Sequence, residues 1–202
     1  MVNLYKTGFL CLVVAMVQAC TTMKMMPDAA SAQAADGKLI VVGKFELNPP
    51  LAKVEKESGK KGFLNTYNPA DYVNTVYFSA TPQAAEKIDQ SMMTPQWNNT
   101  LHATFDETYF KESDAQKTYI NAGMTYVDAI SMDKAWLPGF MSFTPPANAK
   151  AVYIGTVRYT RDDFWNITKV QVIDEYKSAK TEFEKRFGKA IRLEKALLRR
   201  EK

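Results

Sequence analysis

The chain has 202 residues and a formal net charge of +4, and 46% of its residues are hydrophobic, which is too apolar for an intrinsically disordered protein. The excess positive charge lies in the C-terminal segment 174–202, which holds ten Lys or Arg against six Asp or Glu. The rest of the chain is close to neutral and lacks the basic surface that binding to a nucleic-acid backbone requires. We therefore expect no nucleic-acid partner.

The first twenty residues have the layout of an export signal. Lys6 supplies a positive start, and residues 9 to 17 form an apolar run of nine residues, shorter than the about 20 that span a bilayer. The run leads into Val17-Gln18-Ala19-Cys20, an order that resembles the lipobox of bacterial lipoproteins. The sequence therefore predicts a lipoprotein signal peptide over residues 1–19. The alternative is a soluble periplasmic protein with an ordinary signal peptide.

The resemblance implies a covalent lipid anchor at Cys20. In that family the cysteine is alkylated with a diacylglycerol, the signal is cleaved before it, and the new amino terminus is acylated. Several acyl chains anchor a protein stably, whereas one chain gives only marginal membrane binding. Thr21 stands where the family reads an Asp as a signal for retention in the inner membrane. We expect a protein anchored in a Gram-negative outer membrane that faces the periplasm.

The mature chain divides into a tether and one domain. Residues 20–37 are rich in Ala, Ser and Met and contain no aromatic residue, so we expect a flexible tether after the lipidated cysteine. Residues 38–202 are long enough for a single β-rich domain with a sizeable core and a helical C-terminus over 174–200. The only other cysteine, Cys11, lies in the signal peptide, so no disulfide is expected.

The first part of the domain predicts short strands separated by polar segments. A run rich in β-branched residues indicates a strand at 38–47, and alternation indicates one at 72–80. Further short strands are predicted at 100–105, 117–130 and 140–143. The polar segment 51–71 indicates a long loop. Thr81 and Pro82 are typical of a helix start, so a short helix is predicted over 81–93.

The C-terminal third has the clearest pattern. Alternating runs at 151–159 and 167–173, separated by polar turn residues, predict a hairpin, and Gly155 indicates a bulge or a close neighbour in its first strand. A helix is predicted from Asp174, as its cap, to Gly188. Its apolar stripe is expected to pack on the core: Tyr176, Ala179, Phe183 and Phe187. Apolar residues within 190–200 predict a second short helix. The fold class is mainly β, an antiparallel β-sandwich with an inserted short helix and one or two C-terminal helices.

Patterns typical of catalysis and metal binding are missing from the sequence. His102 is the only histidine, and no serine lies in a Gly-x-Ser-x-Gly motif, so we expect no catalytic residue, no metal site and no cofactor. Adjacent carboxylates occur at 162–163 and 174–175, and turn and cap roles explain them better than the paired carboxylates of a glycosidase.

One segment stands out as a candidate interaction surface. Residues 133–146 gather apolar side chains around Pro138-Gly139, and aromatic loops of this kind bind proteins, sugars or lipids. The residues singled out are Trp136, Leu137, Phe140, Met141 and Phe143. The alternative is a turn whose aromatic side chains fold inward.

Three functions remain open at this point. The favoured one is a non-catalytic structural or protein-interaction module of an envelope assembly, with an envelope protein as partner. The second is a lipoprotein that binds a lipid, glycan or small molecule, for which a deep apolar pocket beside Trp136 would be the distinguishing feature. The third is a glycan hydrolase with two carboxylates facing each other across a cleft.

Overall fold

The described part of the molecule is mainly β-strand. The computed structural model describes residues 38–53, 55, 72–82, 100–126 and 134–201. In chain order the elements are β1 (Lys38–Asn48), β2 (Tyr72–Ser79), β3 (Thr100–Thr104), β4 (Thr108–Asp114), β5 (Thr118–Tyr126), β6 (Lys134–Phe143), β7 (Ala151–Arg161), β8 (Ile167–Ile173), α4 (Tyr176–Phe187), β9 (Leu193–Lys195) and β10 (Arg199–Arg200). The predicted fold class is confirmed.

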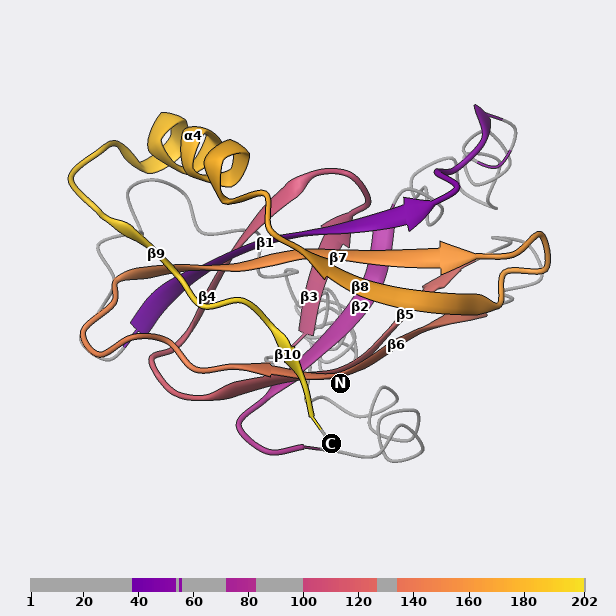
Figure 1. Cartoon of the computed structure of the whole chain (residues 1–202), viewed down its shortest axis with the longest axis horizontal. Helices are drawn as coiled ribbons and strands as arrows, with labels where there is room; N and C mark the ends of the chain where they lie inside the picture. The colour runs from indigo at the N-terminus through magenta and orange to yellow at the C-terminus, as the bar shows by residue number, and fades with distance from the viewer. Residues whose placement is uncertain (1–37, 54, 56–71, 83–99, 127–133, 202) are drawn as a thin grey trace, which may run out of the picture.

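The strands form two sheets that face each other as a sandwich (Figure 1). The first sheet has the order β4-β1-β7-β8, with β9 beside β7, and the second has the order β10-β6-β5-β2-β3. All pairs of the second sheet are antiparallel, as expected. The first sheet is mixed, because β7 runs parallel to both β1 and β9. A parallel pair needs a long connection, and the chain between β1 and β7 supplies it while adding β4 and most of the second sheet.

The central strands β1 and β7 are buried on both faces. On β1, Leu39, Val41 and Phe45 face the second sheet, in the core between the sheets. Ile40 and Val42 face the other way, into a smaller cluster under α4. Double-sided burial explains why this strand reads as an almost continuous apolar run rather than a strict alternation. Each buried aliphatic side chain contributes about 1.5–3 kcal/mol to stability.

Two tyrosine hydroxyl groups are enclosed in the core between the sheets. Within the described residues, the hydroxyls of Tyr109 and Tyr159 have no hydrogen-bond partner. Burial raises the pKa of both phenols well above the ordinary value. Gly43 lies opposite Tyr109 in the neighbouring strand, and a Cβ at Gly43 would be 2.5 Å from the Tyr109 hydroxyl. Glycine at this position therefore makes room for the ring.

Helix α4 covers the outer side of the first sheet, as its apolar stripe predicted. Its residues Ala179 and Phe183 are buried against the sheet. The Phe187 ring packs edge-on against Phe110 of β4, with 5.3 Å between the ring centroids. The helix ends at Gly188 as predicted, with φ 78. Its start differs from the prediction, because Glu175 occupies the N-cap position. Asp174 is one residue earlier, where its carboxylate accepts a hydrogen bond from the Tyr176 amide.

The second C-terminal helix is a wrong prediction. Residues 190–200 form an extended strap in which β9 pairs with β7 and β10 pairs with β6. The strap inserts Leu193 into the cluster under α4 and Leu198 into the core between the sheets. Five residue steps cover about 16 Å when extended but only about 7.5 Å in a helix. An extended chain can therefore reach both clusters and use the hydrogen-bonding groups of both sheets.

The predicted hairpin is confirmed, with β7 and β8 antiparallel. Gly155 lies at a register shift between β1 and β7, with φ 107, and a Cβ there would be 2.7 Å from a methyl group of Val172. Both interpretations of this glycine, a bulge and a close neighbour, are therefore correct.

Strand β4 was not predicted. The signal peptide, Cys20, the tether, the predicted helix 81–93 and most of the predicted loop 51–71 lie outside the described residues.

Candidate functional site

The predicted interaction segment 136–143 is a strand, β6, and not a loop. Its side chains alternate, so Leu137, Met141 and Phe143 are buried in the core between the sheets. Trp136 and Phe140 point away from that core and are 40% and 43% exposed. Three of the five predicted residues are therefore buried and two are exposed, and the binding role of the exposed two stays a prediction. We call the exposed pair, Trp136 and Phe140, the β6 aromatic pair.

A bulge shapes the backbone under the β6 aromatic pair. The register between β5 and β6 shifts between Ile120 and Ala122 of β5. Gly139 lies so close to β5 that a Cβ on it would be 2.5 Å from the backbone of Asn121. Phe140 follows with φ 57, a left-handed conformation that is rare for a residue with a bulky side chain. The exposure of Phe140 thus depends on a glycine directly before it.

The C-terminal strap holds this bulge from the outside. The Glu201 amide donates to the Phe140 carbonyl oxygen at 3.0 Å. The Glu201 carboxylate accepts a hydrogen bond from the Ser142 hydroxyl and pairs with Lys117 at 3.1 Å. The hydrogen bond from Ser142 and the pairing with Lys117 lower the pKa of Glu201. Glu201 therefore holds the Phe140 backbone through one hydrogen bond and the nearby Ser142 through its side chain.

The most exposed large apolar side chain of the described residues is Phe164, at 86%. It belongs to residues 162–166, the connection between β7 and β8, which we call the β7–β8 turn. The sequence indicated a turn here from its polar residues, and the exposed ring was missed. The signal that could have revealed it is Phe164-Trp165 beside turn residues, because an aromatic pair at a hairpin tip has no strand position in which to be buried.

Asp162 organises the β7–β8 turn. Its carboxylate accepts hydrogen bonds from the amides of Phe164 and Asn166 and from the Asn166 side chain, each at 2.9 Å. These bonds lower the pKa of Asp162, those from Asn166 most strongly. Trp165 takes a left-handed conformation, φ 64, and its amide donates to the Asp162 carbonyl at 3.2 Å. The backbone that carries Phe164 is thus held in one shape.

Arg161 joins the turn to the end of β1. Its side chain is only 6% exposed, and Nη2 pairs with the Glu55 carboxylate at 2.8 Å. Nε donates to the Pro49 carbonyl at 3.3 Å. The guanidinium lies over the Trp165 ring, 4.0 Å from its centroid. Trp165 therefore packs against Arg161 and braces the turn, while the neighbouring Phe164 is left in solvent.

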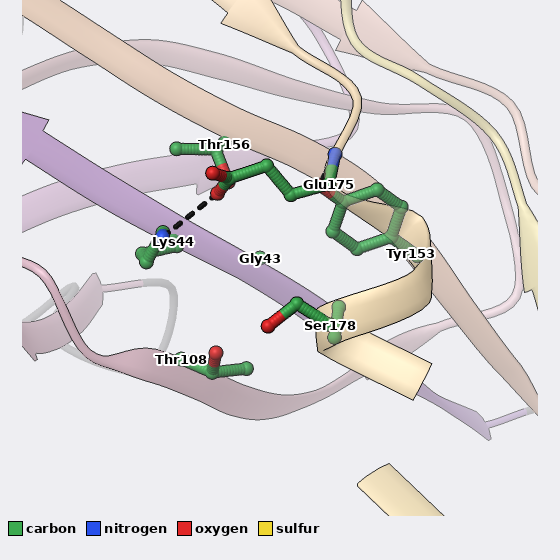
Figure 2. Close-up of a pocket in the computed structure, with 8 residues that line it drawn as sticks. Gly43, Lys44, Thr108, Tyr153, Thr156, Glu175 and Ser178 are labelled. Carbon is green, nitrogen blue, oxygen red and sulfur yellow. Dashed lines mark hydrogen bonds and ion pairs between the residues drawn. The ribbon is translucent and has the colours of Figure 1, made fainter. Parts of the chain in front are cut away.

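A small polar crevice lies where α4 meets the outer side of the first sheet (Figure 2). Lys44 pairs with the Glu175 carboxylate at 2.7 Å, and the Thr156 hydroxyl donates to the same carboxylate at 2.7 Å. The Glu175 amide donates to the Tyr153 hydroxyl at 2.8 Å. Ser178 of α4 and Thr108 complete the lining. The space inside suits one water-sized group, so the crevice in this form is too small for a sugar or lipid.

The charges of the crevice stabilise one another. Burial disfavours the charged form of Lys44, but its bonds to Glu175 and Glu46 outweigh this, and the pKa of Lys44 is raised. The bond to Lys44 is the main reason why the pKa of Glu175 is lowered. Glu46 also pairs with Arg158 at 2.8 Å, so a chain of opposite charges runs across β1 and β7. Its geometry locks the start of α4 onto the sheet.

Three of the four adjacent carboxylates have local partners. Asp162 organises its turn, Glu175 binds Lys44, and Asp174 pairs with Lys195 at 2.7 Å. Asp163 is exposed and makes no ion pair or hydrogen bond within the described residues.

The part of the chain that the structure describes holds no group of three or more His, Cys, Asp or Glu side chains placed to bind a metal ion. Nor does any helix in that part have the length and apolarity needed to cross a membrane.

Comparison with known proteins identifies no relative of this chain. No protein-family model, curated protein or solved structure matches this chain. Function must therefore be argued from the residues themselves.

Proposed function

We propose that this protein is a lipid-anchored lipoprotein of the outer membrane whose periplasm-facing domain is a non-catalytic protein-interaction module. The anchor is supported by the order Val17-Gln18-Ala19-Cys20, which resembles a lipobox. The interaction role is supported by one structural observation above all. The domain holds Trp136, Phe140 and Phe164 in solvent on a backbone that hydrogen bonds and a bulge keep in shape.

Exposed aromatic rings on a fixed backbone favour binding to a protein. Large aromatic side chains supply most of the binding energy at protein interfaces. A backbone that is already ordered loses little entropy when it binds, so more of that energy appears as affinity. The carboxylates at 162, 174 and 175 are engaged in turn, strap and helix contacts, which supports a structural role for them rather than a catalytic one.

Intact mass and membrane fractionation of the full chain test the anchor. The wild type, Cys20→Ser and the matched control Cys11→Ser are expressed in a Gram-negative host. We expect the wild type and Cys11→Ser to begin at residue 20, to carry the added mass of acyl chains and to sediment with the outer membrane. Cys20→Ser should remain unacylated. A wild type that is soluble and unmodified would contradict the proposal.

Crosslinking in cells tests the interaction role. We expect the anchored wild type to form an adduct with another envelope protein after treatment with a lysine-reactive crosslinker of defined length. The purified pair should then form a stable complex when mixed. If the purified protein binds none of the crosslinked proteins, the interaction role is wrong even when the anchor is confirmed.

A further inference from the structure

Phe164 differs from the other exposed rings in how completely it is presented. At 86% exposure it contributes almost nothing to the core, although an apolar ring in water is unfavourable. Asp162 commits its carboxylate to the amides of Phe164 and Asn166, and Arg161 is almost fully buried to brace the turn. A buried arginine and a carboxylate therefore hold the backbone that carries this exposed ring.

The charge of the β7–β8 turn indicates the partner's chemistry. Residues 162–166 carry two carboxylates and no basic residue. The carboxylate of Asp162 is used inside the turn, whereas Asp163, directly beside Phe164, is exposed and has no partner within the described residues. A bare carboxylate next to an apolar ring is complementary to an apolar pocket bordered by basic side chains.

The turn lies at the end of the sandwich opposite Lys38, and its charge argues against a membrane as the partner. The chain enters the domain at Lys38, and β1 then runs to Asn48 at the other end of the sandwich (Figure 1). The bond from Arg161 to Pro49 places the β7–β8 turn at that second end. An 11-residue strand is about 36 Å long, so Phe164 lies a domain length from the point where the tether joins. Asp163 would also be repelled by an anionic lipid surface.

We propose that the β7–β8 turn is the docking element of this domain, and that Phe164 inserts into an apolar pocket of a partner protein whose rim carries Lys or Arg opposite Asp163. This inference deepens the proposed function and rests on it. It assigns the main contact to the turn and not to the β6 aromatic pair. The ion pair of buried Arg161 with the partly exposed Glu55 keeps the turn in its binding shape before the partner arrives.

The test places a photoreactive p-benzoylphenylalanine at position 164 of the full chain, in the native cells, with position 140 as the matched exposed control. The protein captured through position 164 is purified and its affinity for the folded domain is measured. We expect Phe164→Ala to raise Kd about 30-fold, as for an interface anchor, and Phe140→Ala to change it less than about twofold. Asp163→Lys should weaken binding at low salt and lose its effect at high salt.

Several outcomes would overturn this inference. An adduct with phospholipid would make the turn a membrane contact, and an adduct of doubled mass would make it a contact between two copies of this chain. An unchanged Kd for Phe164→Ala would remove the turn from the interface. If position 140 captures a protein that binds and position 164 does not, the docking assignment fails while the interaction role stands. If neither position captures a protein that binds the purified domain, both fail.

Discussion

The two places where the described part of the molecule exposes large aromatic rings are built by different means. At the β6 aromatic pair the backbone sets the geometry, because Gly139 allows β6 to bulge against β5 and the strap from Glu201 holds Phe140. At the β7–β8 turn the side chains set it, because Asp162 and Arg161 supply the bonds that keep the loop in one shape. Phe140 is about half as exposed as Phe164, at 43% against 86%.

Because of this difference, the two regions should respond differently to substitutions and to pH. A backbone bulge is sensitive to any added side chain, because the neighbouring strand cannot move away cheaply. A turn held by charged groups is sensitive instead to the loss of those groups and to pH. The two regions can therefore be altered one at a time.

The largest effect is expected for Gly139→Val at the β6 aromatic pair. The new side chain would begin 2.5 Å from the backbone of Asn121, so the bulge must open, and we expect a loss of about 3 kcal/mol in the free energy of unfolding. Gly188→Ala is the matched control. A Cβ there meets nothing within 4 Å, so only the backbone conformation of Gly188, φ 78 and ψ 179, opposes the change, and a smaller loss of about 1–2 kcal/mol is expected. Equal losses in urea unfolding would contradict the role given to the bulge.

A somewhat smaller effect is expected for Arg161→Ala at the turn. The change removes bonds to Glu55 and Pro49 from a side chain that is only 6% exposed, and should cost about 2–3 kcal/mol. Arg158→Ala is the control, since Arg158 pairs with Glu46 at 38% exposure and should cost less than about 1 kcal/mol. If the two variants unfold at the same urea concentration, the bracing role of Arg161 is wrong.

Acid should loosen the turn locally. The pKa of Asp162 is lowered in the folded chain, so its stabilising effect is complete above the unfolded pKa of about 3.9 and is lost as pH falls through the lower folded value. Hydrogen exchange of the Phe164 and Asn166 amides is the measurement. We expect protection at neutral pH that disappears in Asp162→Ala and, in the wild type, only as pH falls through the folded pKa of Asp162, which lies below the ordinary value of about 3.9. Equal protection in both proteins at neutral pH would contradict the account.

Much of the fold could be predicted because its strongest elements are coded locally. The hairpin of β7 and β8, the apolar run of the first strand and the stripe of α4 can each be recognised within one short segment of the sequence. The strap at 190–200 could not be predicted, because Leu193 and Leu198 fit a helix as well as an extended chain. The free strand edges that favour the extended form exist only once both sheets have formed. Strand β4 was missed for a similar reason, since its polar second half is stabilised by pairing with β1.

The candidate site was only partly predictable. Composition identified segment 133–146, and strand alternation then divided it, burying Leu137 and exposing Trp136. Phe164 was overlooked because polar neighbours marked residues 160–163 as a turn. The presentation of Phe164 depends on how its neighbours Arg161 and Trp165 pack against each other. Packing of this kind depends on Glu55 and Pro49, which lie more than a hundred residues earlier in the chain.

The measurement that tests the central claim most directly is the free energy of unfolding of Phe164→Ala, by urea denaturation beside the wild type. The claim is that Phe164 is held ready for a partner and adds nothing to the fold. Because the ring is 86% exposed, we expect a change within about 0.5 kcal/mol. A loss above about 1.5 kcal/mol would show that the ring packs within the molecule, and the turn would then have no free anchor to offer.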